Sequence, residues 1–334
     1  MTKWSKLAAR ATAAGALASG RSVPSEMTFC TYNPLHAIRG RLAEISYEMR
    51  NCAIVGMPGT QRFADIVEGE QARWTMRRAP KHFCIDVGTR KGGNKSEGVT
   101  IMFAYKFFSP LHIMDIQVPD VDSGFACRNV FVRVCNGRLD FSVCCPYFPV
   151  GRQSAGKDRA RYIQMVSSMC NWTCAKMLAT PARSLQLICT DLNHVTGLVK
   201  DEGGSMIPIH TFSKAVGMCQ PDIEGSAACL FRNILERLSM CMINTCFNAG
   251  CTYHGAHSQT RIDFLCLPYN MLNDVTFCGT VKRVAAKLQV VNVHGIRDHI
   301  PLIVKMQFGF MSDGDFQQIL FNWDRDRIME HLRF

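Results

Sequence analysis

The chain has 334 residues, of which 47% are hydrophobic, so it can bury the core of one large or two ordinary domains, and global disorder is excluded. It carries 38 lysines and arginines against 27 acidic residues, a formal charge of +11 that favours an acidic partner, either nucleic acid or an anionic membrane surface. Charges, prolines or glycines interrupt every apolar stretch before the roughly 18 residues that a membrane-spanning helix needs, so we expect a soluble protein without a membrane partner.

The N-terminal segment, residues 1–26, is rich in alanine, serine and basic residues and has no acidic residue before Glu26. This composition is typical of a disordered leader or of an organellar transit peptide, and either lies outside the fold. Seventeen cysteines, an odd number in a long chain without a secretory leader, indicate reduced thiols rather than a disulfide framework. We therefore expect an intracellular protein of the nucleus or cytoplasm, with organellar targeting as the alternative.

Short apolar runs of β-forming residues, bounded by turn signals, recur from residue 27 onward. In chain order they span residues 27–32, 51–57, 82–87, 98–105, 111–118, 129–134, 139–145, 185–190, 261–267 and 288–293. Helical periodicity is clear over residues 157–179, 226–240 and 315–332. No repeat or long linker divides residues 27–305, which predicts one α/β domain of two packed sheets with outer helices. Residues 306–334 would form a helical extension.

The segment GRQSAGKD, residues 151–158, follows a strand, opens a helix and almost matches the loop that cradles nucleotide phosphates. Asp158 stands where that loop needs the serine or threonine that binds magnesium, and no second nucleotide-binding motif follows. We therefore interpret Arg152 and Lys157 as part of a basic surface that binds nucleic acid.

Three cysteines and two histidines lie close together in the sequence and could be imagined as zinc ligands. They are Cys241, Cys246, Cys251, His254 and His257. Their spacings lack the paired Cys-x2-Cys of a structural zinc site, so we interpret this grouping as coincidental.

Polar clusters lie at the ends of five apolar strands, where an α/β scaffold presents catalytic groups. In chain order they are Tyr32-Asn33-Pro34, Tyr147-Phe148-Pro149, Asp191-Leu192-Asn193, Arg261-Ile262-Asp263 and Asp298-His299-Ile300-Pro301-Leu302. Each cluster alone has an ordinary explanation, because aspartate and asparagine are frequent turn residues. Their occurrence together and in this order indicates one site.

The chemistry that these residue types suggest is phosphodiester hydrolysis with a hard divalent metal. Carboxylate and amide oxygens suit magnesium, which proteins usually hold through one or two carboxylates and the substrate phosphate. A histidine paired with a carboxylate can orient or deprotonate the attacking water. A tyrosine hydroxyl and an asparagine amide can donate hydrogen bonds to the charge that develops on the phosphate. We therefore expect Mg2+ or Mn2+ as the cofactor.

The motifs in this order resemble those of the endonuclease/exonuclease/phosphatase superfamily, which includes deoxyribonuclease I, over nearly all of residues 27–305. The resemblance implies a four-layered α/β/β/α sandwich, in which helices flank two packed mixed sheets, and a metal-dependent phosphodiester hydrolase. It places Asn33 and Asp298 at the metal, Tyr147 and Asn193 at the phosphate, Asp191 at the attacking water, and His299 with its partner Asp263 as the catalytic histidine.

Two further segments resemble the endonuclease domains of non-LTR retrotransposons. They are NKSEGVTIMF, residues 94–103, and NTCFNAGCTYHGAHSQTRIDFL, residues 244–265. In that branch the domain commonly precedes a reverse transcriptase. The resemblance therefore implies a DNA endonuclease, with RNA as an alternative nucleic-acid partner. It also implies that a reverse transcriptase domain could accompany this domain in a longer polyprotein.

The sequence departs from the family at the end of the second strand, where the family has Gln-Glu-Thr and the glutamate is a principal metal ligand. Pro58-Gly59-Thr60 stands there, and the Gly59 position offers no ligand. Carboxylates that follow within a few residues and could substitute are Asp65, Glu68 and Glu70. Loss of a metal ligand predicts weakened or lost activity.

Two other functions remain open. The first is a catalytically inactive nucleic-acid-binding scaffold, which Gly59 and a basic stretch favour. That stretch contains Arg77, Arg78, Lys81, Arg90, Lys91 and Lys95, and an ordinary solvated loop would explain it as well. The second is a phosphatase or a deadenylase of the same superfamily, because the catalytic groups are shared between these branches.

Overall fold

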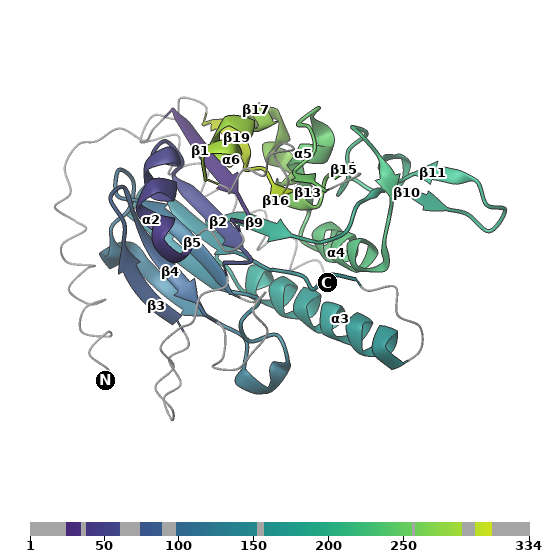
Figure 1. The fold of residues 1–334 in the computed structure, drawn as a ribbon, viewed down its shortest axis with the longest axis horizontal. Coiled ribbons are helices and arrows are strands. Elements are labelled where there is room, and N and C mark those ends of the chain that lie inside the picture. Colours follow the sequence, from purple (N-terminus) through teal and green to yellow (C-terminus); the bar gives the residue numbers. More distant parts are fainter. Residues whose placement is uncertain are drawn as a thin grey trace, which may run out of the picture.

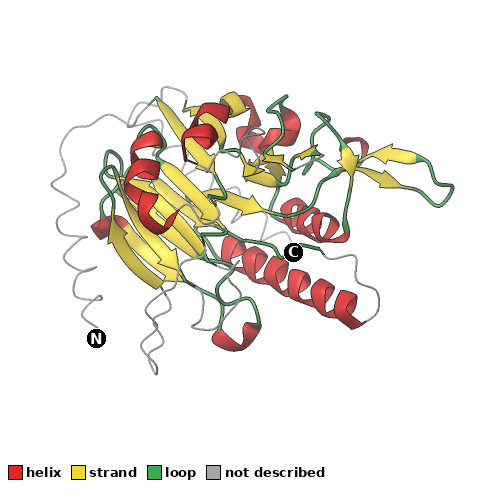
Figure 2. Cartoon of the chain, in the orientation of Figure 1, coloured by secondary structure: helices red, strands yellow, loops and turns green. Residues whose placement is uncertain are grey.

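The structure is a computed structural model that describes residues 25–34, 38–60, 74–88, 98–151, 157–255, 258–288 and 298–308. Two large β-sheets pack against each other, and helices cover the outer face of each sheet (Figure 1, Figure 2). This is the four-layered α/β/β/α sandwich that the sequence predicts.

The first sheet has seven strands in the order β17-β19-β1-β2-β5-β4-β3. Its strands are β1 (Glu26–Thr31), β2 (Ile54–Pro58), β3 (Trp74–Arg78), β4 (His82–Val87), β5 (Val99–Ala104), β17 (Val275–Thr280) and β19 (Leu302–Gln307). β1 pairs in parallel with β2 and antiparallel with β19, so the two ends of the described chain lie in neighbouring strands.

The second sheet has six strands in the order β13-β16-β9-β8-β7-β6. Its strands are β6 (Ile113–Gln117), β7 (Phe131–Cys135), β8 (Asp140–Cys144), β9 (Leu185–Asp191), β13 (Met240–Met242) and β16 (Asp263–Pro268). β8 and β9 run parallel, so the chain needs a long crossover between them, which helix α3 (Lys157–Leu178) provides.

Two small three-stranded sheets accompany the large ones. The first has the order β11-β10-β12, with β10 (Gly197–Lys200), β11 (Met206–Pro208) and β12 (Asp222–Ile223). The second has the order β15-β14-β18, with β14 (Tyr253–His254), β15 (Gln259–Thr260) and β18 (Asp298–His299). The second small sheet positions the site described below, because it sets His299 opposite Tyr253.

Inner strands of the two large sheets such as β2, β5 and β16 bury both faces, which explains why their sequences are apolar runs rather than alternating patterns. The edge strands β3 and β6 are only half-buried. In β1, Phe29 faces the core between the sheets, whereas the next residue, Cys30, faces the helices outside. In β9, Leu187 and Ile188 divide in the same way. The rings of Phe29 and Phe141, one from each sheet, have centroids 5.6 Å apart.

Helices form the two outer layers. Helices α2 (Ile38–Glu48) and α6 (Lys282–Leu288) cover the first sheet, and α3 and α4 (Ser226–Arg237) cover the second, while α5 (Ile243–Cys246) is a single turn after β13. Ile45 and Val284 pack with Cys30 on one side, and Met169 and Phe231 pack with Ile188 on the other. None of the described helices is both long enough and apolar enough to cross a membrane.

Most of the predicted elements are observed, but the fold also contains elements that were not predicted, among them β3, β17, β19 and α2. Every predicted strand up to residues 261–267 coincides with an observed strand, and α3 and α4 confirm the first two predicted helices. The strand prediction over residues 288–293 is wrong at Leu288, which ends α6. Val284, Ala285 and Leu288 are buried at helical spacing, which explains the difference. The remainder of that run lies outside the described residues.

Both expected domain boundaries fall inside strands. β1 begins at Glu26, the last residue of the expected leader, which pairs with Gln307. β19 runs past the expected boundary at residue 305, because Met306 is buried and pairs with Met27. The rest of the leader and the predicted helix over residues 315–332 lie outside the described residues.

The seventeen cysteines are all described, and all carry free thiols. Most are buried and pack as small apolar side chains, as the sequence predicts for Cys84, Cys144 and Cys189, whereas Cys135 is only half-buried. Burial raises the pKa of the Cys144 and Cys189 thiols to about 12, so both stay protonated and unreactive.

Candidate active site

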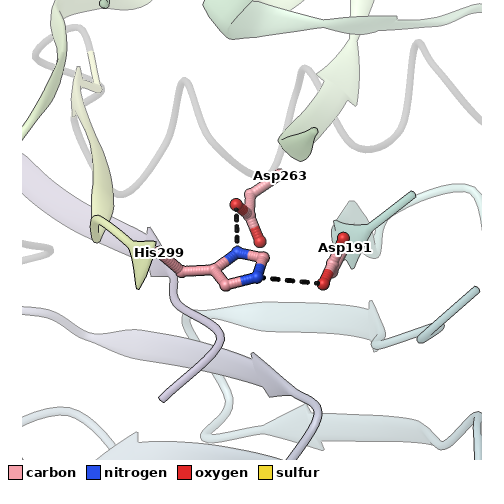
Figure 3. Close-up of side chains that lie close together, drawn as sticks. All are labelled: Asp191, Asp263 and His299. Atoms are coloured by element: carbon pink, nitrogen blue, oxygen red, sulfur yellow. Dashed lines mark hydrogen bonds and ion pairs between the residues drawn. The ribbon is translucent and has the colours of Figure 1, made fainter. Parts of the chain in front are cut away.

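Asp191, Asp263 and His299 meet at one end of the second sheet (Figure 3). Asp191 ends β9 and Asp263 begins β16, and the antiparallel pairing of these strands sets the two residues directly opposite each other. His299 comes from β18, and its ring lies between the two carboxylates. One ligand atom from each of the three residues lies within 4.8 Å of the others.

The Asp263 carboxylate orients His299. Its Oδ2 atom lies 2.8 Å from Nδ1 of His299, and both side chains are almost fully buried. Because an ionised carboxylate only accepts hydrogen bonds, Nδ1 carries a proton and Nε2 is directed at Asp191. The start of β16 is held in turn by the Thr252 hydroxyl, which accepts hydrogen bonds from the backbone N–H groups of Ile262, at 3.1 Å, and Asp263, at 3.0 Å.

Asn33 brings the first sheet into the site. It follows β1, is 1% exposed, and its Nδ2 atom donates to Oδ2 of Asp191 over 2.8 Å. The same Nδ2 atom lies 3.4 Å from Nε2 of His299, which is itself 3.7 Å from Oδ2 of Asp191. The structure therefore joins four of the predicted site residues, from both large sheets, in one buried polar group.

Asn193 and Tyr147 lie next to this group. The backbone N–H of Asn193 donates to Oδ1 of Asp191 over 2.9 Å, and its Nδ2 atom donates to the Phe148 carbonyl over 2.7 Å. Tyr147 forms a parallel β-bridge with Asp191, and its ring centroid lies 5.2 Å from the Arg128 guanidinium. Burial, reinforced by the Asp191 charge, raises the pKa of Tyr147 to about 12, so its hydroxyl keeps its proton and can donate.

The charges in this group interact strongly. Burial and the Asp263 carboxylate raise the pKa of Asp191 to about 7. Burial would lower the pKa of His299, but the carboxylates of Asp263 and Asp191 raise it to about 9. At neutral pH the ring is therefore an imidazolium that can donate from Nε2, while Asp191 can exchange a proton near neutral pH.

The residues present fit a hard divalent cation. Asp298 is half-buried, with Oδ1 3.9 Å from Nε2 of His299. Three carboxylates, those of Asp191, Asp263 and Asp298, thus lie around a single imidazolium, and Oδ1 of Asp263 is buried without a hydrogen-bond partner. A cation would neutralise the excess negative charge, and the oxygens of Asn33, Asp191 and Asp298 could hold it.

Three known structures of similar fold are of nucleic-acid enzymes, and the first two are of the same Neisseria enzyme, NExo. A 3′ phosphatase from Neisseria bound to a product DNA hairpin has a TM-score of 0.55 at 12% identity, over 84% of this chain and 100% of its own. A 3′-5′ exonuclease from Neisseria meningitidis has a TM-score of 0.56 at 13% sequence identity, and the match covers 84% of this chain and 100% of the exonuclease. An AP endonuclease from Leishmania major has a TM-score of 0.55 at 12% sequence identity, and the match covers 90% of this chain and 99% of the endonuclease.

The fold is deoxyribonuclease I-like. At identities this low the similarity concerns the fold alone, and the site has to be judged from its own residues. No protein-family model and no curated protein sequence matches the chain.

Gly59 stands in this deoxyribonuclease I-like fold at the position where the motif resemblance puts a metal-binding glutamate. Its φ of 76° is in the left-handed region that favours glycine. A Cβ atom built on Gly59 would lie 2.5 Å from Oδ1 of Asn33, so the Asn33 amide occupies the space of a side chain. The three carboxylates considered as substitutes, Asp65, Glu68 and Glu70, lie outside the described residues.

In the described chain, Asp191, Asp263 and His299 are the one group of metal-binding side chains with ligand atoms this close. Among the described residues, Cys241, Cys246, Cys251 and His254 form no such group, and His257 lies outside the described residues.

The residues predicted to bind nucleic acid are only partly described. Arg77 makes a bidentate ion pair with Asp86, so its charge is compensated within the sheet, whereas Arg78 is exposed. Lys157 begins α3, but its side chain is not among the described parts of the structure. The residues Arg90, Lys91 and Arg152 lie wholly outside the described residues.

Sequence reasoning missed residues that support the site. Thr252 anchors Asp263, and the Tyr253 ring contacts the His299 ring edge-on with centroids 5.1 Å apart. Arg128 is 6% exposed and lies against Tyr147. Thr252 and Tyr253 belong to a segment that resembles the retrotransposon endonucleases, which was a usable signal, but Arg128 looks like an ordinary residue before a strand.

Proposed function

We propose that this chain is a metal-dependent phosphodiester hydrolase, and more specifically a DNA endonuclease of the retrotransposon type. The observation that carries the proposal is the buried chain of Asn33, Asp191, His299 and Asp263, which joins the ends of strands from both sheets of a deoxyribonuclease I-like fold. Burying four polar side chains costs free energy that packing does not require, so such a group is expected at a functional site.

The residues divide the chemistry among them. Asp191, whose carboxylate the Asn33 amide orients, is placed to position the attacking water and accept its proton. His299, held as an imidazolium by Asp263, donates from Nε2 to a phosphate oxygen and offsets the charge that develops there. The Tyr147 hydroxyl and the Asn193 amide provide neutral donors to the same phosphate.

A divalent cation, Mg2+ or Mn2+, would bind through the oxygens of Asn33, Asp191 and Asp298 and would supply Lewis-acid stabilisation of the phosphate charge. DNA as the substrate is supported by the formal charge of +11, because phosphate contacts dominate nucleic-acid affinity. The retrotransposon branch, and a reverse transcriptase as a covalent neighbour, follow from the motif resemblance and are part of the proposal.

A nicking assay tests this function. The purified chain is incubated with supercoiled plasmid and Mg2+, and we expect nicked circles whose formation falls at least 100-fold in His299→Ala. His210→Ala is the matched control, because His210 is an exposed histidine outside the site. Absence of nicking, or equal nicking by His299→Ala, would rule the function out. Single-stranded DNA, RNA, poly(A) and small phosphate esters in the same assay separate the endonuclease from a phosphatase or deadenylase.

The second candidate is a nucleic-acid-binding scaffold without activity, and Gly59 favours it, because the side chain that would hold the metal is missing. This candidate predicts DNA binding that needs no metal and weakens steeply between 50 and 200 mM salt, by about 1000-fold for six phosphate contacts. Binding to a labelled duplex in EDTA, measured across that salt range, decides it. A salt-independent affinity would contradict the scaffold.

A further inference from the structure

His194 follows Asn193 and is packed between two glycines. A Cβ atom on Gly151 would lie 2.7 Å from Nε2 of His194, and one on Gly225 would lie 2.3 Å from Nδ1. Both positions therefore need glycine while the ring is in place. Gly151 follows the Tyr147 segment, and Gly225 precedes α4, so the ring lies where three parts of the chain converge.

The ring is held by a hydroxyl from a fourth element. Tyr162, in the second turn of α3, has its hydroxyl oxygen 2.6 Å from Nε2 of His194. Burial raises the pKa of Tyr162 to about 12 and lowers that of His194, so a neutral hydroxyl donates to a neutral imidazole. Neither group takes part in the chemistry proposed above, which leaves this hydrogen bond without an assigned role.

His194 follows Asn193 directly in the chain, and the backbone of Asn193 is unusual. Asn193 has a φ of 54°, in the left-handed region, and its side chain reaches the Phe148 carbonyl while its N–H reaches Asp191. A turn of this kind holds its shape only if its neighbours determine it. Because adjacent residues share a rigid peptide plane, a shift of His194 moves Asn193 as well.

We propose that Tyr162 and His194 are positioning residues that hold the Asn193 amide in place for the scissile phosphate. The proposal rests on the hydrolase function above and deepens it, because it assigns to α3 a part in the reaction that the sequence motifs do not include. The pair acts through Asn193 and contacts neither the reacting phosphate nor the attacking water.

A double-mutant cycle tests the coupling to Asn193. Tyr162→Phe removes one oxygen atom, and we expect kcat for nicking to fall about tenfold with KM changed less than twofold, because misplacement of about 1 Å can cost 100-fold. In an Asn193→Ala background the same change should have no further effect on kcat. Tyr47→Phe is the matched control, since Tyr47 is 52% exposed on α2, over the other sheet.

Rescue by a conservative variant separates positioning from general damage. His194→Gln keeps an oxygen that can accept from the Tyr162 hydroxyl, and it should retain several-fold more kcat than His194→Ala at equal Tm. An unchanged kcat in Tyr162→Phe, or the same tenfold loss in the Asn193→Ala background, would overturn the proposal.

A measurement without turnover keeps this inference separate from the proposed function. In metal-free, isotope-labelled protein, Tyr162→Phe should shift and broaden the side-chain amide resonance of Asn193, while Tyr47→Phe should leave it unchanged. An undisturbed Asn193 resonance in Tyr162→Phe overturns the positioning role. If wild-type protein nicks nothing but this resonance responds, the hydrolase function fails and the coupling between Tyr162 and Asn193 stands.

Discussion

Gly59 combines two constraints at a single residue, a backbone that favours glycine and a neighbour that fills the side-chain space. A positive φ costs other residues about 1–3 kcal/mol. The contact with Oδ1 of Asn33, at 2.5 Å from the hypothetical Cβ, adds a displacement of the amide that bonds Asp191. The local backbone and packing at position 59 therefore favour glycine over the glutamate.

We expect Gly59→Glu to lose activity rather than restore it. The new side chain would push Asn33 away from Asp191, and the free energy of unfolding should fall by about 2 kcal/mol or more. Chemical denaturation and the nicking assay measure both effects. Gly137→Ala is the matched control, because Gly137 also has a positive φ, 87°, but nothing within 4 Å of its Cβ position. Gly59→Glu protein that nicks faster than wild type would show that the site can accept the carboxylate.

His82 shows how a single buried residue sets a pH dependence. Its Nε2 atom lies 3.2 Å from the Cys52 carbonyl and donates to it, and its Nδ1 atom lies 3.0 Å from the Ser46 hydroxyl. That hydroxyl accepts from the backbone N–H of Lys81, so its own proton is directed at Nδ1. These contacts satisfy the neutral ring, and burial lowers the pKa of His82 below 6.5.

Because the folded-state pKa of His82 is lowered, the unfolded chain binds its proton more tightly. The contribution of the neutral His82 ring to the stability of the fold is complete above pH 6.5. As the pH falls below that value, the free energy of unfolding decreases by at most about 1.4 kcal/mol per pH unit. Urea unfolding at pH 7.5 and at pH 5.5 measures it. His82→Gln should flatten this part of the curve, and an equal slope in wild type and variant would contradict the assignment.

Helix α4 is attached to the small sheet of β10, β11 and β12 by a buried ion pair. The Arg232 Nε atom lies 3.1 Å from Oε1 of Glu224, and the two side chains are 10% and 2% exposed. The Thr196 hydroxyl also donates to Glu224 over 2.9 Å. This pair therefore joins two elements that the sequence places next to each other without indicating how they pack.

Breaking this pair on one side should be costly, because it leaves a buried charge without its partner. We expect Arg232→Met to lower the free energy of unfolding by about 3–5 kcal/mol. Lys305→Met is the matched control and should cost about 1 kcal/mol or less, since Lys305 and Glu26 form an exposed pair at 3.8 Å. Equal losses in the two variants, measured by urea unfolding, would mean that Glu224 is not effectively buried.

The whole molecule depends on the junction of its two sheets. Asn33 extends from β1 of one sheet and Asp191 ends β9 of the other, so a cation bound between them would link the two layers. A ligand that binds only the folded state raises its stability by mass action.

We therefore expect 10 mM Mg2+ to raise the Tm of metal-free protein by about 2–4 °C, which corresponds to roughly 1 kcal/mol in a protein of this size. Asp191→Asn should lose most of this response, because it removes a charged ligand. Asp222→Asn, at an exposed carboxylate, should keep it. Thermal scans with and without EDTA make the comparison, and an equal rise in wild type and Asp191→Asn would exclude Asp191 from the metal site.

The sequence by itself determined most strands of the two large sheets, the helices α3 and α4, and the residues of the site. Runs that bury both faces, such as β1 and β9, are visible as continuous apolar segments, and α3 and α4 have clear helical periodicity, because these signals are local. The site residues stand in recognisable short motifs after these strands. Strand β3 has no apolar run and is half-buried, so its sequence carried no comparable signal.

Tertiary structure alone decided which residues act together. Asp263 and Asp191 are opposite each other only because β16 pairs with β9, and Arg77 is compensated only because β3 pairs with β4. The conformation of Gly59, the closure of β19 on β1 and the bond between Tyr162 and His194 are likewise contacts between distant segments. Such contacts depend on strand register and on packing between layers, which residue order does not encode locally.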